Sequence, residues 1–131
     1  MNVLLDTHVL VWWLRNSARL GKRAKALIGN DETTIWVSSA SIWEISIKAA
    51  LGRLDIMEQF DEQFSLELER SGFRSLVVKF DHAFAVRTLP LHHHDPFDRM
   101  LVAQAQCEDL TLVTADPAIM AYDIRTIDAT V

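Results

Sequence analysis

The sequence predicts an α/β fold in which a mostly parallel sheet is covered by helices on both faces. Short apolar runs of strand length alternate along the chain with amphipathic segments of helical length, and this alternation is typical of βαβ units with right-handed crossovers. The length of 131 residues fits one compact domain, so we expect a single domain over residues 1–131. Half of the residues are apolar, as in an ordinary globular protein with one core.

In the first half of the chain, each predicted strand is followed by a helix. Val3-Leu4-Leu5 is a short apolar run of the kind found in buried strands. Residues 33–37 are β-branched and aromatic, which favours a second strand. Helical patterns cover residues 8–14, 22–28, about 41–51 and 60–70. Three of the four end near a glycine, at Gly29, Gly52 and Gly72, a common helix stop.

The second half of the chain repeats this order. Strands are predicted over residues 76–78, 110–113 and 125–127, the last of them at an edge of the sheet. Pro90 ends a helix predicted over residues 82–89, because proline cannot continue a helix. Asp95-Pro96 and Asp116-Pro117 each join a capping residue to a proline at the first helical position. They predict two further helices, the first of which runs to about Cys107.

The composition limits the classes of function. A net charge of −5 argues against a protein that binds nucleic acid through a broadly basic surface, although it does not exclude a nuclease. No apolar stretch reaches the roughly 18 residues of a membrane-spanning helix, and no basic region precedes the N-terminal apolar run. The single cysteine, Cys107, cannot form an intramolecular disulfide. We therefore expect a cytoplasmic protein with no membrane association.

Four acids stand where a strand or loop gives way to a helix, namely Asp6, Glu44, Asp98 and Asp116. In parallel sheets, ligands bind beyond the carboxyl ends of the strands, and we expect the four acids to meet at that edge. Two carboxylates about 4 Å apart repel by ~1 kcal/mol in water and by ~4 kcal/mol at an effective dielectric of 20. A hard divalent cation such as Mg²⁺ or Mn²⁺ prefers oxygen ligands and offsets this repulsion. The pattern therefore predicts a metal site.

Each acid also has an explanation that involves no function. Asp6 is a candidate cap for the helix that follows it, and Asp98 falls in the first turn of its helix, where the helix dipole favours an acid. Ser41-x-x-Glu44 fits a capping box, and Glu44 stands four residues before Lys48, the spacing of a helix-stabilising ion pair. The metal interpretation therefore depends on the acids converging.

Three adjacent histidines, His92, His93 and His94, precede the helix of Asp98. Neighbouring histidines on one loop cannot all face one ion, and no thiolate cluster is present to complete a structural zinc site. We expect one of them to order the loop before Asp98 and the others to be solvated. The chain also lacks a Gly-x-Ser-x-Gly nucleophile elbow, a P-loop and a dinucleotide fingerprint.

The motifs around the four acids resemble those of PIN-domain ribonucleases, and within them VapC-type toxins of toxin–antitoxin pairs. The segments that carry the resemblance are Leu4-Leu5-Asp6-Thr7-His8, Ser38-x-x-Ser41-x-Trp43-Glu44-Ile45, Lys48, Gly52-Arg53-Leu54, His94-Asp95-Pro96-Phe97-Asp98-Arg99, Ala103-Gln104-Ala105 and Leu112-Val113-Thr114-Ala115-Asp116. They span nearly the whole chain. The resemblance implies a three-layer α/β/α sandwich of the PIN type.

The resemblance also implies a Mg²⁺- or Mn²⁺-dependent endoribonuclease in which metal-activated water hydrolyses RNA phosphodiesters. The four acids would be its catalytic and metal-binding residues. Thr7 and Thr114 stand where a hydroxyl can hold a carboxylate or water, and Asp95 resembles the helix cap of the shared motif. The basic residues nearest the acids in sequence are Lys48, Arg53 and Arg99. They are candidates for binding RNA, with solvated charges or helix ion pairs as the alternative.

The expected partners follow from the same resemblance. It implies a homodimer and a small cognate antitoxin, VapB-like, whose C-terminal segment blocks the acidic crevice. Trp36 and Trp43 are expected to pack in the core.

Two other functions remain open at this point. One is a binding module of the same fold that has lost catalysis, which the intact set of four acids disfavours, and the other is a metal-dependent phosphatase or DNA nuclease.

Overall fold

The computed structural model of the protein describes residues 1–52 and 62–131. Within these residues, strands form one sheet in the order β3-β2-β1-β4-β5, and each neighbouring pair is parallel. The strands span Asn2–Leu5 (β1), Thr34–Ser38 (β2), Arg74–Leu76 (β3), Thr111–Thr114 (β4) and Thr126–Asp128 (β5). The predicted parallel sheet is confirmed.

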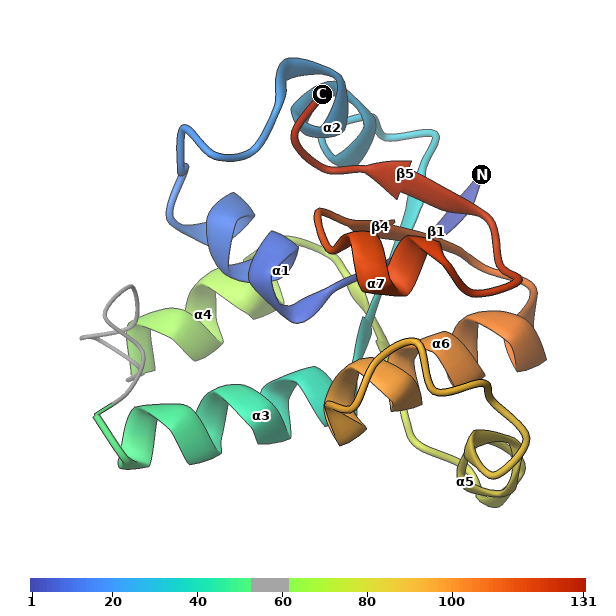
Figure 1. Ribbon diagram of the computed structural model, residues 1–131. Helices are drawn as coiled ribbons and strands as arrows, with labels where there is room; N and C mark the ends of the chain where they lie inside the picture. The colour runs from blue at the N-terminus through green and yellow to red at the C-terminus, as the bar shows by residue number, and fades with distance from the viewer. Residues whose placement is uncertain (53–61) are drawn as a thin grey trace.

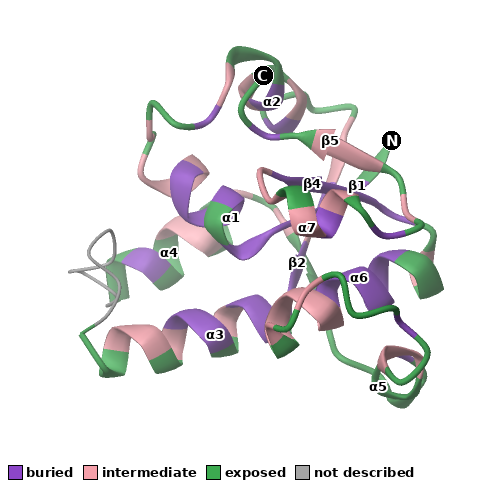
Figure 2. Ribbon diagram, viewed as in Figure 1, coloured by how far each residue is buried: buried purple, intermediate pink, exposed green. Residues whose placement is uncertain are grey.

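Helices cover both faces of this sheet (Figure 1). They span Thr7–Leu14 (α1), Lys22–Ile28 (α2), Ser39–Ala50 (α3), Glu62–Arg70 (α4), Phe80–Val86 (α5), Pro96–Glu108 (α6) and Pro117–Met120 (α7). The buried residues of Figure 2 gather between these layers. No helix in the part of the chain that the structure describes is long and apolar enough to cross a membrane.

The residues of β1 divide the core into two clusters, because successive side chains of a strand point to opposite faces. Val3 and Leu5 pack into one cluster with residues of α1, α2 and α4, among them Phe64. Leu4 packs into the other with residues of α6 and α7, among them Leu101. All three strand residues are fully buried. The predicted three-layer α/β/α sandwich is therefore confirmed.

β3 and α5 lie earlier in the chain than predicted. β3 pairs with β2 only as far as Ser38 opposite Leu76, because β2 ends there and α3 begins. Val77 and Val78 consequently have no strand to pair with among the described residues and are exposed, so the strand predicted over residues 76–78 lies two residues too late. The helix predicted over residues 82–89 spans Phe80–Val86 instead. For the helix predicted over residues 60–70, the structure describes Glu62–Arg70, and residues 60–61 lie outside the described part.

The strand order reverses at β1, which has β2 on one side and β4 on the other. In a parallel sheet, such a reversal leaves a crevice beyond the carboxyl ends of the strands. Leu5 at the end of β1 lies beside Val113 of β4, so the residues that follow these two strands emerge next to each other. Helix α3 contacts both α1 and α6. All four acids belong to segments that meet there.

Candidate active site

Asp6 follows β1 directly and is only 3% exposed. Its Oδ2 accepts a 2.7 Å hydrogen bond from the Thr114 hydroxyl, whereas its Oδ1 is buried and has no hydrogen-bond partner among the described residues. Burial, to which the charge of Glu44 adds, raises the pKa of Asp6, and the bond from Thr114 opposes this shift. Although Asp6 occupies the cap position of α1, its side chain makes no capping bond. The cap interpretation of Asp6 is therefore wrong, and its carboxylate turns toward the other acids.

Glu44 lies in the middle of α3 and is 2% exposed. Its Oε2 pairs with Lys48 one turn later, as the spacing predicted, and its Oε1 is buried without a hydrogen-bond partner in the described part of the chain. The capping-box interpretation of Ser41 and Glu44 is wrong, because the cap of α3 is Ser38, whose hydroxyl accepts from the Ala40 N–H at 3.0 Å. With no capping role, Glu44 directs a carboxylate into the site.

Ser41 and Thr7 join α3 to α1 beside the acids. The Thr7 hydroxyl donates a 2.9 Å hydrogen bond to the Ser41 hydroxyl, and both residues are buried. Thr7 was predicted as a residue whose hydroxyl holds a carboxylate or water. In the structure that hydroxyl is bonded to Ser41, and it thereby fixes the start of α1 against the helix that carries Glu44.

Asp95 and Asp98 have different roles at the start of α6. Asp95 caps the helix as predicted, because its Oδ1 accepts from the backbone N–H groups of Phe97 and Asp98 at 2.8 and 3.1 Å. The Asp98 side chain is left free to face the site. Burial raises the pKa of Asp98 to about 7, and the charges of Asp6, Asp95 and Glu44 add to this effect. Through these charges, Asp98 interacts with Asp6, which precedes α1, and with Glu44 on α3.

Asp116 follows β4 and is held on both of its oxygens. Its Oδ1 accepts from the Ala118 N–H at 2.9 Å and so caps α7 as predicted, while its Oδ2 lies 2.8 Å from Nε2 of His93. Its own N–H donates to the Thr114 hydroxyl at 3.1 Å. The same hydroxyl donates to Asp6, so Thr114 connects the first and the fourth acid.

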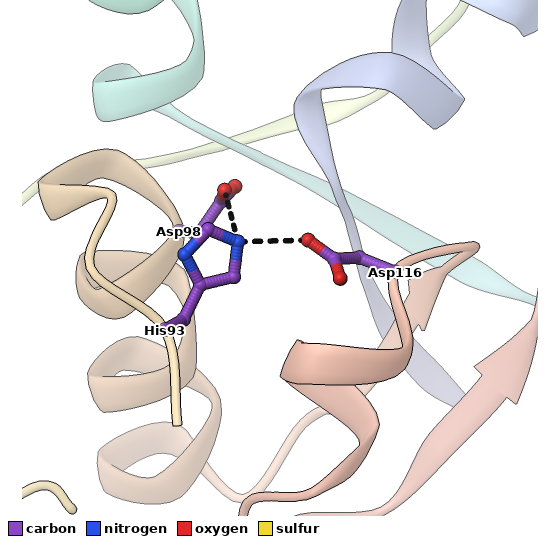
Figure 3. A group of neighbouring side chains, drawn as sticks. All are labelled: His93, Asp98 and Asp116. Atoms are coloured by element: carbon purple, nitrogen blue, oxygen red, sulfur yellow. Dashed lines mark hydrogen bonds and ion pairs between the residues drawn. The ribbon is translucent and has the colours of Figure 1, made fainter. Parts of the chain in front are cut away.

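His93 is the site residue whose place the sequence did not reveal. Its imidazole lies between Asp98 and Asp116, with Nε2 3.1 Å from Oδ2 of Asp98 and 2.8 Å from Oδ2 of Asp116 (Figure 3). Candidate ligand atoms of these three residues all lie within 4.8 Å of one another. Asp6 and Glu44 do not belong to that tightest group among the described residues, and their link to Asp98 is the electrostatic one.

The three candidate RNA-binding residues differ in their surroundings. Lys48 pairs with Glu44, and its side chain is 35% exposed. The hydrogen bond and charge of Glu44 outweigh the burial that would lower the pKa of Lys48, so this pKa is raised. The Arg99 guanidinium instead donates to the Pro90 and Val86 carbonyls at 2.9 and 3.2 Å. Arg53 lies outside the described residues.

Beside the acidic edge lies an apolar hollow of about 660 Å³ between α3, α5 and α6. Its lining includes Trp43, Val78, Phe97 and Met100. Trp43 is 63% exposed and contacts Phe97 edge to face at 5.1 Å, so the prediction that it packs in the core is wrong. Glu44, the next residue on α3, is buried, because neighbouring residues of a helix point in different directions.

Comparisons with known proteins agree with this architecture. The chain matches a family model described as the PIN domain over residues 3–124. The comparison with curated proteins finds no match. VapBC2 from Rickettsia felis, bound to a DNA fragment from their promoter, gives a TM-score of 0.69 at 16% identity, with 98% of each chain covered. A toxin–antitoxin complex from Klebsiella pneumoniae gives 0.64 at 18% identity, with 97% of each chain covered.

A third solved structure, FitAcB from Neisseria gonorrhoeae, gives a TM-score of 0.57 at 16% identity over 98% of each chain. At such identities the solved structures share the fold of this chain, and the fold by itself does not fix a function. The match to the family model covers nearly the whole sequence, including Asp6, Glu44, Asp98 and Asp116. The chain therefore belongs to the PIN-domain family, whose members are nucleases.

Proposed function

We propose that this protein is a Mg²⁺- or Mn²⁺-dependent endoribonuclease of the cytoplasm and the toxin of a toxin–antitoxin pair. The observation that carries the proposal is a pair of buried carboxylate oxygens, Oδ1 of Asp6 and Oε1 of Glu44, which have no hydrogen-bond partner among the described residues. A buried charge is costly unless it is paired or coordinates a metal. A cation held by Asp6, Glu44 and Asp98 would satisfy both oxygens, and it would offset the burial and the neighbouring charges that raise the pKa of Asp98.

The donor set fits a hard cation. Carboxylate oxygens are the ligands that Mg²⁺ and Mn²⁺ prefer, and no thiolate belongs to the site. When bound, such a cation activates water for attack at phosphorus and stabilises the charge that develops on the phosphate oxygens. A 3′-hydroxyl and a 5′-phosphate are the expected products.

The residues of the chain itself divide the remaining work. Asp6, Glu44 and Asp98 bind the cation, and Thr114 fixes the orientation of Asp6 through its hydroxyl. Asp116, connected to Asp6 through Thr114, would orient water or assist a second ion. Thr7 and Asp95 hold the helices that carry Glu44 and Asp98.

Substrate phosphates need positive partners near the acids. Lys48 is the described candidate, since its side chain is partly exposed and already contacts Glu44. Arg53 remains a candidate on its sequence position. Arg99 has less support, because its guanidinium is engaged with backbone carbonyls of its own chain. An overall charge of −5 then reflects in part the acids that a bound cation would neutralise.

The proposed partners are a VapB-like antitoxin and a second copy of this chain. Two of the structurally similar proteins are described as VapBC2 and a toxin–antitoxin complex, which supports an antitoxin partner. We expect the C-terminal segment of this antitoxin to block the acidic crevice with a basic side chain. The apolar hollow supports the homodimer. Trp43, which lines the hollow, is 63% exposed, and Phe80 and Phe84 of the neighbouring helix α5 are 84 and 75% exposed. Exposed apolar surface of this kind is typical of interfaces.

The experiment that tests the activity incubates the purified protein with structured RNAs, including tRNA, with Mg²⁺ or with EDTA. Asp6→Asn is the inactive variant, and Asp31→Asn, an exposed acid before β2, is the matched control. We expect cleavage by the wild type and Asp31→Asn in Mg²⁺ alone. Cleavage that persists in EDTA, or that survives Asp6→Asn unchanged, would contradict the metal mechanism.

DNA and a phosphomonoester, each tested beside RNA, distinguish the alternative functions. Cleavage of single- or double-stranded DNA with RNA left intact would favour a DNA nuclease, and release of phosphate from a phosphomonoester would favour a phosphatase. No reaction with any substrate would favour a binding module. For the toxin role, expression of the chain alone should arrest growth, and coexpression with the product of the neighbouring gene should restore it.

A further inference from the structure

His93 approaches the acidic site from the loop before α6, and its imidazole separates two of the carboxylates (Figure 3). Nε2 lies 2.8 Å from Oδ2 of Asp116 and 3.1 Å from Oδ2 of Asp98. Two explanations fit these distances. Nε2 is either a nitrogen ligand that would join both acids around a metal ion, or an N–H donor that bridges them.

The other nitrogen of the ring distinguishes the two explanations. The backbone N–H of Asp95 points to Nδ1 of His93 at 3.0 Å, so Nδ1 is a hydrogen-bond acceptor. A neutral imidazole has one nitrogen with a hydrogen and one with a free lone pair. Since the lone pair is on Nδ1, the hydrogen is on Nε2. An Nε2–H group donates to carboxylates and has no lone pair for a metal ion.

The loop backbone is held at several points, which fixes the ring in this orientation. The N–H of His93 donates to the Tyr122 hydroxyl at 3.0 Å, and the Arg99 guanidinium donates to the same hydroxyl at 3.1 Å. Arg99 also binds the Pro90 carbonyl at the start of the loop, and the His92 ring packs edge to face on Tyr122 at 4.8 Å. These contacts give Arg99 a structural task in place of an RNA contact.

We propose that His93 is a positioning residue that, as an Nε2–H donor, holds Asp116 beside Asp98 and does not bind the metal. Both oxygens of Asp116 then keep their bonds, one to His93 and one to the Ala118 N–H. The direct ligands are left as Asp6, Glu44 and Asp98, with Asp116 oriented as a partner for water. The assignment of His93 as a donor rests on its hydrogen bonds alone. Only the effect of a positioned Asp116 on catalysis rests on the proposed function.

The tautomer is measurable without any substrate. In ¹⁵N-histidine-labelled full-length protein, two-bond ¹H–¹⁵N spectra distinguish a nitrogen with a hydrogen from one without, and His93→Gln identifies the signals of His93. We expect the Nε2–H tautomer in metal-free protein and its persistence after addition of Mg²⁺ or Zn²⁺. A ring without a hydrogen on Nε2 in metal-free protein, or loss of the Nε2 hydrogen on metal addition, would overturn the proposal.

Matched variants test the positioning role. His93→Gln retains an N–H donor and His93→Ala removes it, while His94→Ala changes an exposed neighbour. With a tRNA pool in Mg²⁺, we expect His93→Ala to lower kcat ~10- to 100-fold with little change in KM, as found for residues that orient metal ligands. His93→Gln should recover most of the rate and His94→Ala should resemble the wild type. An unimpaired His93→Ala, or a His93→Gln as impaired as His93→Ala, would overturn the donor role.

Failure of this inference and failure of the proposed function give different results. If the wild type cleaves no RNA, the tautomer still decides whether His93 is a donor or a ligand. If Mg²⁺ leaves the ¹³C signals of the Asp6 and Asp98 carboxyl groups unchanged, the metal site fails while the donor assignment stands.

Discussion

The Thr114 hydroxyl donates a 2.7 Å hydrogen bond to Oδ2 of Asp6, a residue 108 positions earlier in the chain. The same hydroxyl accepts from the Asp116 N–H, so one buried side chain fixes two of the four acids. The contact is possible because β1 and β4 are parallel neighbours with Leu5 opposite Val113. The sheet topology thus brings the two ends of the sequence into one site.

Replacing Thr114 by valine keeps the shape of the side chain and removes the hydroxyl. Oδ2 of Asp6 then loses its donor, which leaves both carboxylate oxygens buried without a partner in the described structure. Loss of a donor to a buried group costs about 1–3 kcal/mol, and we expect the free energy of unfolding to fall by that amount in metal-free protein. Thr114→Ser, which restores the hydroxyl, should recover the stability in the same urea titration. Equal stability of the valine variant and the wild type would show that the bond does not hold Asp6.

Asp6→Asn should separate stability from activity. The buried carboxylate is unfavourable in metal-free protein, where burial raises its pKa, and removing its charge relieves that cost. We therefore expect Asp6→Asn to raise the Tm in EDTA, to abolish the rise in Tm that Mg²⁺ produces, and to abolish cleavage. Calorimetric scans with and without Mg²⁺ measure both changes, with Asp31→Asn as control. A Mg²⁺-dependent rise in Tm that survives in Asp6→Asn would exclude Asp6 as a ligand.

Metal-free protein should lose stability as the pH rises toward neutrality. Burial, reinforced by neighbouring acids, raises the pKa of Asp98 from 3.8 to about 7. Between these pH values, folded protein retains a proton that unfolded protein releases, so the free energy of unfolding falls with rising pH across this window. The raised pKa of Asp6 acts in the same direction. Asp98→Asn should flatten this part of the profile, measured by urea unfolding in EDTA from pH 4 to pH 8, and an identical slope in the variant would contradict the assignment.

The same pKa predicts the pH dependence of metal binding. A carboxyl group must lose its proton before it binds a cation. We expect Mn²⁺ affinity to fall as the pH drops below about 7, where Asp98 is protonated in metal-free protein. Binding near neutral pH should release protons, which titration calorimetry detects as a dependence of the heat on the buffer. Binding that releases no protons near pH 7 would count against a shifted Asp98.

The apolar hollow yields a prediction about assembly. Phe84 is 75% exposed on α5, the helix whose Ala83 and Val86 line the hollow, and a charge there would oppose burial of this helix against a second copy. We expect Phe84→Asp to shift a dimer to a monomer in sedimentation velocity with an unchanged circular dichroism spectrum. Leu66 on α4 is also exposed but belongs to another helix layer, so Leu66→Asp serves as the control that stays dimeric. A wild type that is monomeric at high concentration would contradict the proposed homodimer.

Sequence periodicity predicted most of the fold because the strands of a buried parallel sheet are short apolar runs, as in Val3-Leu4-Leu5. The edge where the acids meet was also predictable, since it follows from strand direction. The start of β3 was not, because the length of a strand depends on its partner, and β2 ends at Ser38. The exposure of Trp43 was equally hidden, since an aromatic residue at an interface and one in a core give the same pattern.

The bonds within the site were harder to foresee than its members. Each of three adjacent histidines fits the sequence equally well, and only His93 turns its ring between Asp98 and Asp116. Its orientation depends on Tyr122, a residue far along the chain that contacts its backbone. Arg99 next to the acids suggested a phosphate contact, whereas its guanidinium holds the same loop. Such roles are set by contacts between distant segments, which spacing along the sequence does not reveal.

The buried acids Asp6 and Glu44 are central to the proposed cation site. Titration calorimetry of Mn²⁺ into the wild type, Asp6→Asn and Glu44→Gln in RNA-free buffer tests it most directly. We predict saturable binding to the wild type and to Asp31→Asn, and loss of that binding in both site variants. Equal binding to all four proteins, or no binding to the wild type, would contradict the claim.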